Sequence, residues 1–139
     1  MAQLSSYLHF GGNCRDAMTF YQSCLGGELN VQMVGDTPMA EQMPEEARQQ
    51  VIHSMLTTEG IVIFASDMVD GTEVVRGNTV RLCLNCSSEE EIHTLFAKLS
   101  AGGQIGHPLK TEFWGGTFGE LTDKFGISWM LNYDKNAQQ

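Results

Sequence analysis

In the first half of the chain, segments whose apolar positions have the period of a strand stand before and after one segment with the period of a helix. Ser6 to Phe10 is a short strand-like run, and Asn13 is a candidate cap for the helical pattern that follows it. Glycines at 26 and 27 end this helix, and strands are predicted over 29–34, 51–57 and 61–66. The apolar positions of the predicted helix are Ala17, Phe20, Tyr21, Cys24 and Leu25.

The second half repeats this order. A strand is predicted over 79–86, with Val80, Leu82 and Leu84 on one face, and Ser88 with Glu91 forms a capping-box pattern before the next helix. The apolar stripe of this helix is Ile92, Leu95, Phe96 and Leu99. Glycines at 102 and 103 end it, and strands are predicted from 104, over 117–121 and over 127–133. The sequences LGGEL (25–29) and AGGQI (101–105) correspond, so each half reads β-α-β-β-β.

The repeat predicts an α+β fold in one domain over 1–139, made of two βαβββ modules. The first module spans 1–68, a linker spans 69–77, and the second module spans 78–139. The polar segment 35–50 is expected to hold a short helix over 44–50. A βαβββ unit presents a curved sheet with its helix on one face. Two such paired, curved, mixed sheets enclose a cleft, the kind of place where small ligands bind.

Composition narrows the classes of partner. The chain has 17 acidic and 8 basic residues and a net charge of -9, with no cluster of bases. Nucleic-acid binding depends on clustered Lys and Arg, so neither nucleic acid nor an anionic membrane is an expected partner. No apolar run approaches the roughly 20 residues of a membrane span. The N-terminus has no basic region before an apolar stretch, so a cytoplasmic location is expected.

The four cysteines include a C-x-x-C at Cys83 and Cys86. These residues fall in a predicted strand, where side chains three positions apart point to opposite faces. A redox pair would sit at a helix N-terminus, and a zinc site needs a second pair of similar spacing. Ordinary thiols are therefore expected.

Three segments identify a family resemblance: FGGNCRDAMTFYQSCLGGEL (10–29), VIHSML with FASDM (51–68), and TEFWGGTFGELTDKFGISWMLN (111–132). They resemble the vicinal oxygen chelate superfamily, which includes glyoxalase I, bleomycin-resistance proteins and extradiol dioxygenases, and within it the PhnB-like group. The resemblance implies paired βαβββ modules and a homodimer. Members often carry a 3-demethylubiquinone-9 3-methyltransferase label, but methyltransferases that use S-adenosylmethionine normally need a larger α/β domain. Fold alone does not fix the reaction.

Metal-dependent relatives hold a divalent ion with His and Glu side chains on four strands. The resemblance places the matching positions near Ser6, Ile63, Thr79 and Met130, and none of these is a usual ligand. Three of the four strands carry no His or carboxylate in any register. No metal and no other cofactor is therefore expected.

His53 is the candidate catalytic residue. It is either a histidine hydrogen-bonded within the sheet or a cleft-facing group able to act as general base or hydrogen-bond anchor. The resemblance favours the second interpretation. Asp67 is expected to cap the turn that follows it rather than face the cleft mouth. Arg81 either reaches solvent or meets an anionic ligand or an acid such as Glu112. The candidate ligand-binding residues, each with a core position as its alternative, are Phe10, Phe64, Trp114, Phe118 and Met130.

Two functions from different classes follow. The first is metal-independent binding of a small molecule in the cleft, as in the bleomycin-resistance branch. The second is a glyoxalase- or dioxygenase-type enzyme that uses His53 or a metal ion. The sequence favours the first, because it carries no convincing pair of catalytic groups.

Overall fold

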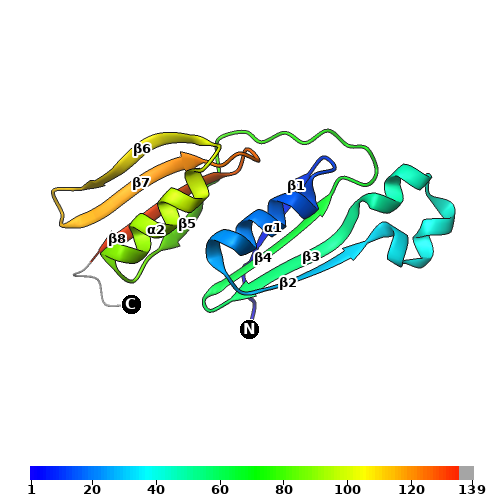
Figure 1. Ribbon diagram of the computed structural model, residues 1–139, viewed down its shortest axis with the longest axis horizontal. Coiled ribbons are helices and arrows are strands. Elements are labelled where there is room, and N and C mark those ends of the chain that lie inside the picture. Colours follow the sequence, from blue (N-terminus) through cyan, green and yellow to red (C-terminus); the bar gives the residue numbers. More distant parts are fainter. Residues whose placement is uncertain (135–139) are drawn as a thin grey trace. The chain divides into compact units, whose positions relative to one another are not determined.

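The computed structural model describes residues 1–134 of the chain, so the end of the predicted second module, 135–139, lies outside the described residues. The chain separates into two compact units that divide between Val75 and Arg76. Each unit is a four-stranded mixed sheet with one long helix (Figure 1). This confirms the predicted α+β fold of two βαβββ modules. No helix within 1–134 is long and apolar enough to cross a membrane.

The first module has strand order β1-β4-β3-β2, in which β1 runs parallel to β4 and the other neighbours are antiparallel. The parallel pair needs a crossover, and the rest of the module supplies it. The elements are β1 (Ser6–Phe10), α1 (Cys14–Leu25), β2 (Glu28–Met33), β3 (Val51–Thr58) and β4 (Ile61–Asp67).

The second module repeats this topology in the order β5-β8-β7-β6, with β5 parallel to β8. Strand β5 is shorter than the predicted 79–86, because its pairing with β8 begins only at Leu82 opposite Trp129. Val80 therefore lies outside the strand and is 76% exposed. The elements are β5 (Leu82–Asn85), α2 (Glu89–Ser100), β6 (Gln104–Thr111), β7 (Gly116–Thr122) and β8 (Ser128–Asp134).

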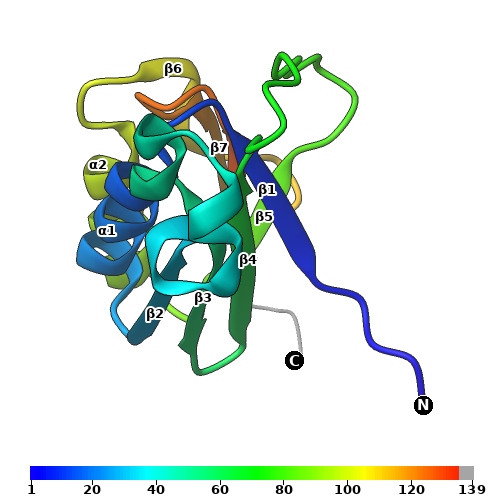
Figure 2. The same ribbon diagram turned by 90° about the vertical axis from the view of Figure 1, so that its right-hand side faces the viewer.

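Three short 3₁₀ helices join β2 to β3 where the sequence predicts one helix over 44–50 (Figure 2). Ala47 N–H donates to Pro44 O and Gln50 N–H to Ala47 O, which are i→i+3 bonds. Proline supplies no N–H, so Pro38 and Pro44 keep the segment from continuing as an α-helix. The 3₁₀ helices span Val34–Asp36, Pro38–Gln42 and Glu45–Gln49.

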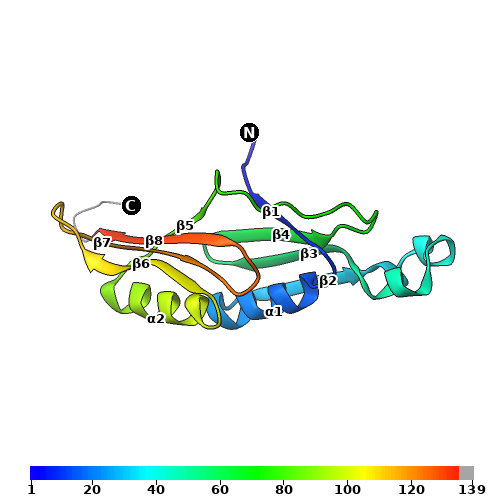
Figure 3. The ribbon, with the colours of Figure 1, turned by 90° about the horizontal axis from the view of Figure 1, so that it is seen from above.

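Each helix packs along one face of its own sheet (Figure 3). Ile63 and Ala65 of β4 point to α1 and are buried, and Leu121 and Leu131 are buried on the α2 side of the second sheet. The buried side chains of the helices are Cys14, Ala17, Met18, Tyr21 and Cys24 on α1, and Ile92, Phe96 and Leu99 on α2. We call the opposite face of each sheet the helix-free face.

The two glycine pairs occupy equivalent places in the modules. Gly26 and Gly102, which end the helices, have φ angles of 78° and 77°, a conformation open to glycine. At Gly27 an added Cβ would collide with the carbonyl oxygen of Thr57, and at Gly103 with that of Thr122. The motif shared by both halves therefore reflects a close approach of backbones that a side chain would block.

The cap of α1 comes from Asp67, at the end of β4. Its Oδ1 accepts from Gly12 N–H at 2.8 Å and Cys14 N–H at 3.0 Å, and its Oδ2 accepts from Val51 N–H at 2.9 Å. Asn13 does occupy the predicted N-cap position, and its carbonyl accepts from Ala17 N–H, but its side chain makes no cap hydrogen bond. The Asp67 carboxylate thus accepts hydrogen bonds at the starts of α1 and β3, whereas the prediction was that it caps the turn after β4.

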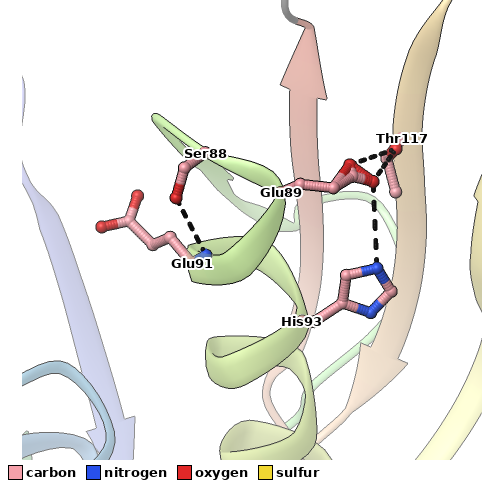
Figure 4. Close-up of polar contacts among 5 residues, drawn as sticks. All are labelled: Ser88, Glu89, Glu91, His93 and Thr117. Atoms are coloured by element: carbon pink, nitrogen blue, oxygen red, sulfur yellow. Dashed lines mark hydrogen bonds and ion pairs between the residues drawn. The ribbon is translucent and has the colours of Figure 1, made fainter.

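Half of the predicted capping box is present at α2. Ser88 Oγ accepts from Glu91 N–H at 3.0 Å, as expected of an N-cap (Figure 4). The Glu91 carboxylate accepts from the backbone N–H and the hydroxyl of Ser87, one residue before the N-cap. The motif thus predicts the start of the helix correctly, but the Glu91 carboxylate accepts from Ser87 and not from the N-cap residue Ser88.

Candidate functional site

The helix-free face of the first sheet presents an aromatic surface. Side chains alternate along β4, so Phe64 points away from α1 while its neighbours Ile63 and Ala65 are buried against it. Phe64 lies opposite Tyr7 of β1 on one side and Met55 of β3 on the other. This register gathers side chains from three strands on one surface.

Four rings form what we call the aromatic cluster: Tyr7, His9, His53 and Phe64. The ring centroids of Tyr7 and Phe64 are 6.2 Å apart with planes 21° apart, and those of His53 and Phe64 are 5.7 Å apart with planes 32° apart. The rings of Tyr7 and His9 are 5.1 Å apart. Tyr7 is 46% exposed, both histidines are exposed, and Phe64 is half-buried. The cluster is therefore held together yet accessible within its module.

One hydrogen bond supports the cluster from the sheet. The hydroxyl of Tyr7 donates to Ser66 Oγ at 3.1 Å, which fixes the outer end of the ring. His53, the predicted catalytic residue, lies opposite Gln32 in the register of β2 and β3 and is exposed. His53 is thus exposed on the helix-free face, and its role as a cleft-facing base or anchor stays a prediction.

The helix-free face of the second sheet is charged. Arg81 Nε lies 3.3 Å from Glu120 Oε2, so the acid that Arg81 meets is Glu120 and not Glu112. Glu112 lies instead near His107, whose Nε2 is 3.6 Å from Glu112 Oε1. The Arg81–Glu120 ion pair is partly exposed, so solvent screens it and it contributes little to stability.

Two predicted ligand-binding residues lie on this second face. The Phe118 ring meets the His107 ring edge-on at 5.3 Å. Met130 lies opposite Glu120 of β7 and Cys83 of β5, and is half-buried. Phe118 and Met130 are thus brought to one surface with a charged pair beside them.

The remaining two candidates lie elsewhere. Phe10 has no exposed surface and alternates with His9 along β1, so it belongs to the core beneath α1 rather than to a ligand-binding surface. Trp114 is 47% exposed in the turn between β6 and β7, where its ring meets that of Phe113 edge-on at 5.3 Å. Its exposure comes from a turn, not from a sheet face.

The four cysteines are free thiols. Cys14 and Cys24 of the first module are buried, whereas Cys83 of the second module is exposed and Cys86 is half-buried. Burial raises the pKa of Cys14 to about 12 and that of Cys86 to about 11, and it also raises the pKa of Cys83. The thiolate is the nucleophile and the metal ligand, so these shifts disfavour redox and zinc chemistry at neutral pH.

The donor set does not fit the metal site of the superfamily. Among residues 1–134, no three His, Cys, Asp or Glu side chains gather closely enough to hold an ion. Of the positions matched by resemblance, Ile63 is 3% exposed, Thr79 precedes β5, and Met130 offers only a thioether. The absence of a metal from the working protein stays a prediction.

A second polar cluster ties α2 to β7 on the helix side (Figure 4). The Thr117 hydroxyl donates to both carboxylate oxygens of Glu89, at 2.7 and 3.1 Å, and His93 Nε2 lies 3.8 Å from Glu89 Oε1. The hydroxyl thus meets the carboxylate and not the imidazole, and Thr117 is only 4% exposed. This arrangement is a structural tie rather than a nucleophile with its base.

Two βαβββ modules, each with a helix on one sheet face, define a protein of the glyoxalase/bleomycin-resistance/dioxygenase fold. A structure of that description from Burkholderia phytofirmans PsJN superposes with a TM-score of 0.62 at 15% identity, covering 92% of this chain and 96% of its own. That likeness shows the fold alone.

The chain belongs to the family described as 3-demethylubiquinone-9 3-methyltransferase, whose sequence model matches residues 2–132. Protein YjdN of Escherichia coli (strain K12) is 35% identical over 145 residues, covering 95% of each chain. The crystal structure of protein PA1353 from Pseudomonas aeruginosa has a TM-score of 0.85 at 33% identity, covering 96% of this chain and 98% of its own. The PhnB protein from Bacillus cereus has a TM-score of 0.77 at 29% identity, covering 95% and 99%. The family match and the likeness to the PhnB protein support the predicted PhnB-like group, and the more distant structures share the predicted fold.

Proposed function

We propose that the protein binds a small molecule on its helix-free sheet faces and needs no metal ion to do so. The observation that carries the proposal is the aromatic cluster of the first module, whose rings are exposed or half-buried on a rigid sheet. Ligand sites combine apolar and aromatic walls with a few polar groups, and the cluster supplies both kinds. The donor set described above supports the metal-independent form of the proposal.

Methyl transfer is not part of this proposal. The family description names a methyltransferase, but a family name and a fold do not place catalytic groups in a particular chain. Methyltransferases that use S-adenosylmethionine normally have a larger α/β domain, whereas residues 1–134 here form two βαβββ modules. The residues on the sheet faces, and not the label, therefore guide the choice of assay.

The test is a binding screen on the full chain. Binding of each compound in a panel of small molecules is measured by ligand-observed NMR, with and without EDTA. The measurement is then repeated on His53→Ala for each compound that binds. The matched control is His93→Ala, because His93 is exposed on α2 and lies on the helix side. We expect EDTA to leave binding unchanged and only His53→Ala to weaken it. Binding that appears only with added Zn²⁺ or Ni²⁺ would contradict the metal-independent form.

A second candidate function is a glyoxalase- or dioxygenase-type enzyme that uses His53 as its base. The observation in its favour is that His53 is exposed on the helix-free face with its ring against Phe64. An assay of lactoylglutathione formation, with and without Ni²⁺ or Zn²⁺, separates the two. We expect no activity in either condition, and robust turnover abolished in His53→Ala would establish the enzyme instead.

A further inference from the structure

The aromatic cluster also indicates which class of ligand the first module takes. We propose that it recognises a molecule that has a planar aromatic ring system and no negative charge. This inference rests on the proposed function and names the ligand class of the same surface. Its two supports are the orientation of the rings and the distribution of charge between the two helix-free faces.

Ring orientation favours a planar ligand. Along the neighbouring strands β1, β4 and β3, the planes of Tyr7, Phe64 and His53 differ by only 21° and 32° in turn. Aromatic pairs gain energy in offset-stacked or edge-to-face contact, at centroid distances like those seen here. A flat ring system that contacts two or three of these side chains can make such contacts together. An aliphatic molecule of the same size would gain binding free energy only from the apolar area that it buries.

Charge disfavours an anionic ligand. Strands β1 to β4 contain no Lys or Arg. The acid on this face is Glu28, which lies opposite Thr57, whereas the side chains opposite Phe64, His53 and Met55 carry no formal charge. An anionic ligand would lose hydration without meeting a cation, and the net charge of -9 repels it further. The second module differs, because Arg81 and Glu120 form an ion pair on its helix-free face. The helix-free face of the first sheet thus lacks the Lys or Arg that the second carries, and its one Asp or Glu is Glu28 of β2.

A polar group can orient the ligand. The Tyr7 hydroxyl uses its proton on Ser66 Oγ, so its oxygen still accepts a hydrogen bond. A hydroxyl on the aromatic ligand can donate to it while the ring contacts Phe64. Tyr7 lies on edge strand β1 and is 46% exposed, so a ligand reaches it without opening the core.

Three probes with one carbon framework test the proposal. They are 2-naphthol (planar and neutral), decahydro-2-naphthol (saturated and neutral) and 2-naphthoate (planar and anionic). Each is titrated into the full chain and followed by ¹H–¹⁵N NMR. We expect 2-naphthol to shift amides of β1, β3 and β4, and to bind roughly three- to tenfold more tightly than either other probe.

Substitutions locate the site. Tyr7→Leu and Phe64→Leu keep apolar bulk and remove a ring, so each should weaken 2-naphthol binding roughly three- to tenfold. Phe113→Leu is the matched control, because Phe113 is 97% exposed in a turn of the other module. Circular dichroism confirms that each variant is folded. Tyr7 lies on an exposed edge strand, so Tyr7→Leu keeps the test decisive even where Phe64→Leu does not fold.

The outcomes separate this inference from the proposed function. Equal affinity for the saturated alcohol or for naphthoate overturns the ligand class but leaves small-molecule binding standing. Shifts confined to other strands overturn the location. Loss of a dimer in Tyr7→Leu, with no shift in the cluster from 2-naphthol, shows that a second copy covers this face and overturns the inference. No binding by any probe or any member of the screening panel overturns both proposals.

Discussion

Asp67 holds three parts of the first module together, so its removal should be costly. Its carboxylate accepts from the backbone N–H groups of Gly12, Cys14 and Val51, which lie in the turn after β1, at the start of α1 and at the start of β3. Cys14 and Val51 have no exposed surface, so water cannot replace the lost acceptor there. In Asp67→Ala two buried donors are left unpaired.

The magnitude follows from those two donors. Each buried N–H left without an acceptor costs about 1–3 kcal/mol, so Asp67→Ala should lower the free energy of unfolding by about 2–6 kcal/mol. That is a large share of the roughly 5–15 kcal/mol typical of a domain. Asp67→Asn keeps one oxygen as acceptor, so we expect it to cost less than Asp67→Ala.

Urea denaturation followed by far-UV circular dichroism measures this loss. With a slope of about 2 kcal/mol per M, the Asp67→Ala midpoint should fall by about 1–3 M. Asp70→Ala is the matched control, because the Asp70 carboxylate accepts hydrogen bonds locally, from Thr72, and lies in an exposed loop. Its midpoint should stay unchanged. An Asp67→Ala midpoint equal to that of the wild type would refute the role assigned to this carboxylate.

Three further predictions concern backbone packing, a buried thiol and the candidate site. Gly103→Ala should lower the melting temperature because the added Cβ would collide with the Thr122 carbonyl oxygen. Gly106→Ala should be tolerated, because its added Cβ would lie 3.8 Å from Glu120 O, and equal melting temperatures of the two variants would contradict this. Burial raises the pKa of Cys14 from 9.0 to about 12, so the thiol ionises first in the unfolded chain, and its stabilising contribution is lost as pH rises above 9. Urea midpoints between pH 9 and 11 should therefore fall more steeply for the wild type than for Cys14→Ala, and parallel slopes would contradict it. His53→Ala should stay folded by circular dichroism and bind its ligand more weakly, whereas gross unfolding would show that His53 is structural.

The repeat made most of the fold predictable. The period of apolar positions located both long helices, and the paired glycines marked their ends because only glycine fits there. The start of β5 was misjudged because a strand exists only where its partner pairs with it, and β8 does so from Leu82 onward. Only one helix was predicted before β3, where the structure has three 3₁₀ helices, because the segment has no strong periodic pattern of apolar residues.

The candidate site was harder to predict, because it depends on contacts between distant residues. The cap of α1 comes from Asp67, far along the chain, whereas Asn13 was the local choice. Tyr7 and His9 were missed because the parallel register of β1 and β4 places Tyr7 opposite Phe64 and His9 opposite Ser66. A signal for Phe10 was available, since it shares a strand face with Leu8 and so reads as core.

The most direct test of the account is native mass spectrometry of the freshly purified full chain, prepared without chelator. It measures the subunit number, any metal and any retained small molecule in one spectrum. We predict a homodimer that carries no stoichiometric divalent ion, with any retained ligand lost in Phe64→Leu and kept in Phe113→Leu. One metal ion per chain, removed by EDTA together with all ligand binding, would contradict the account.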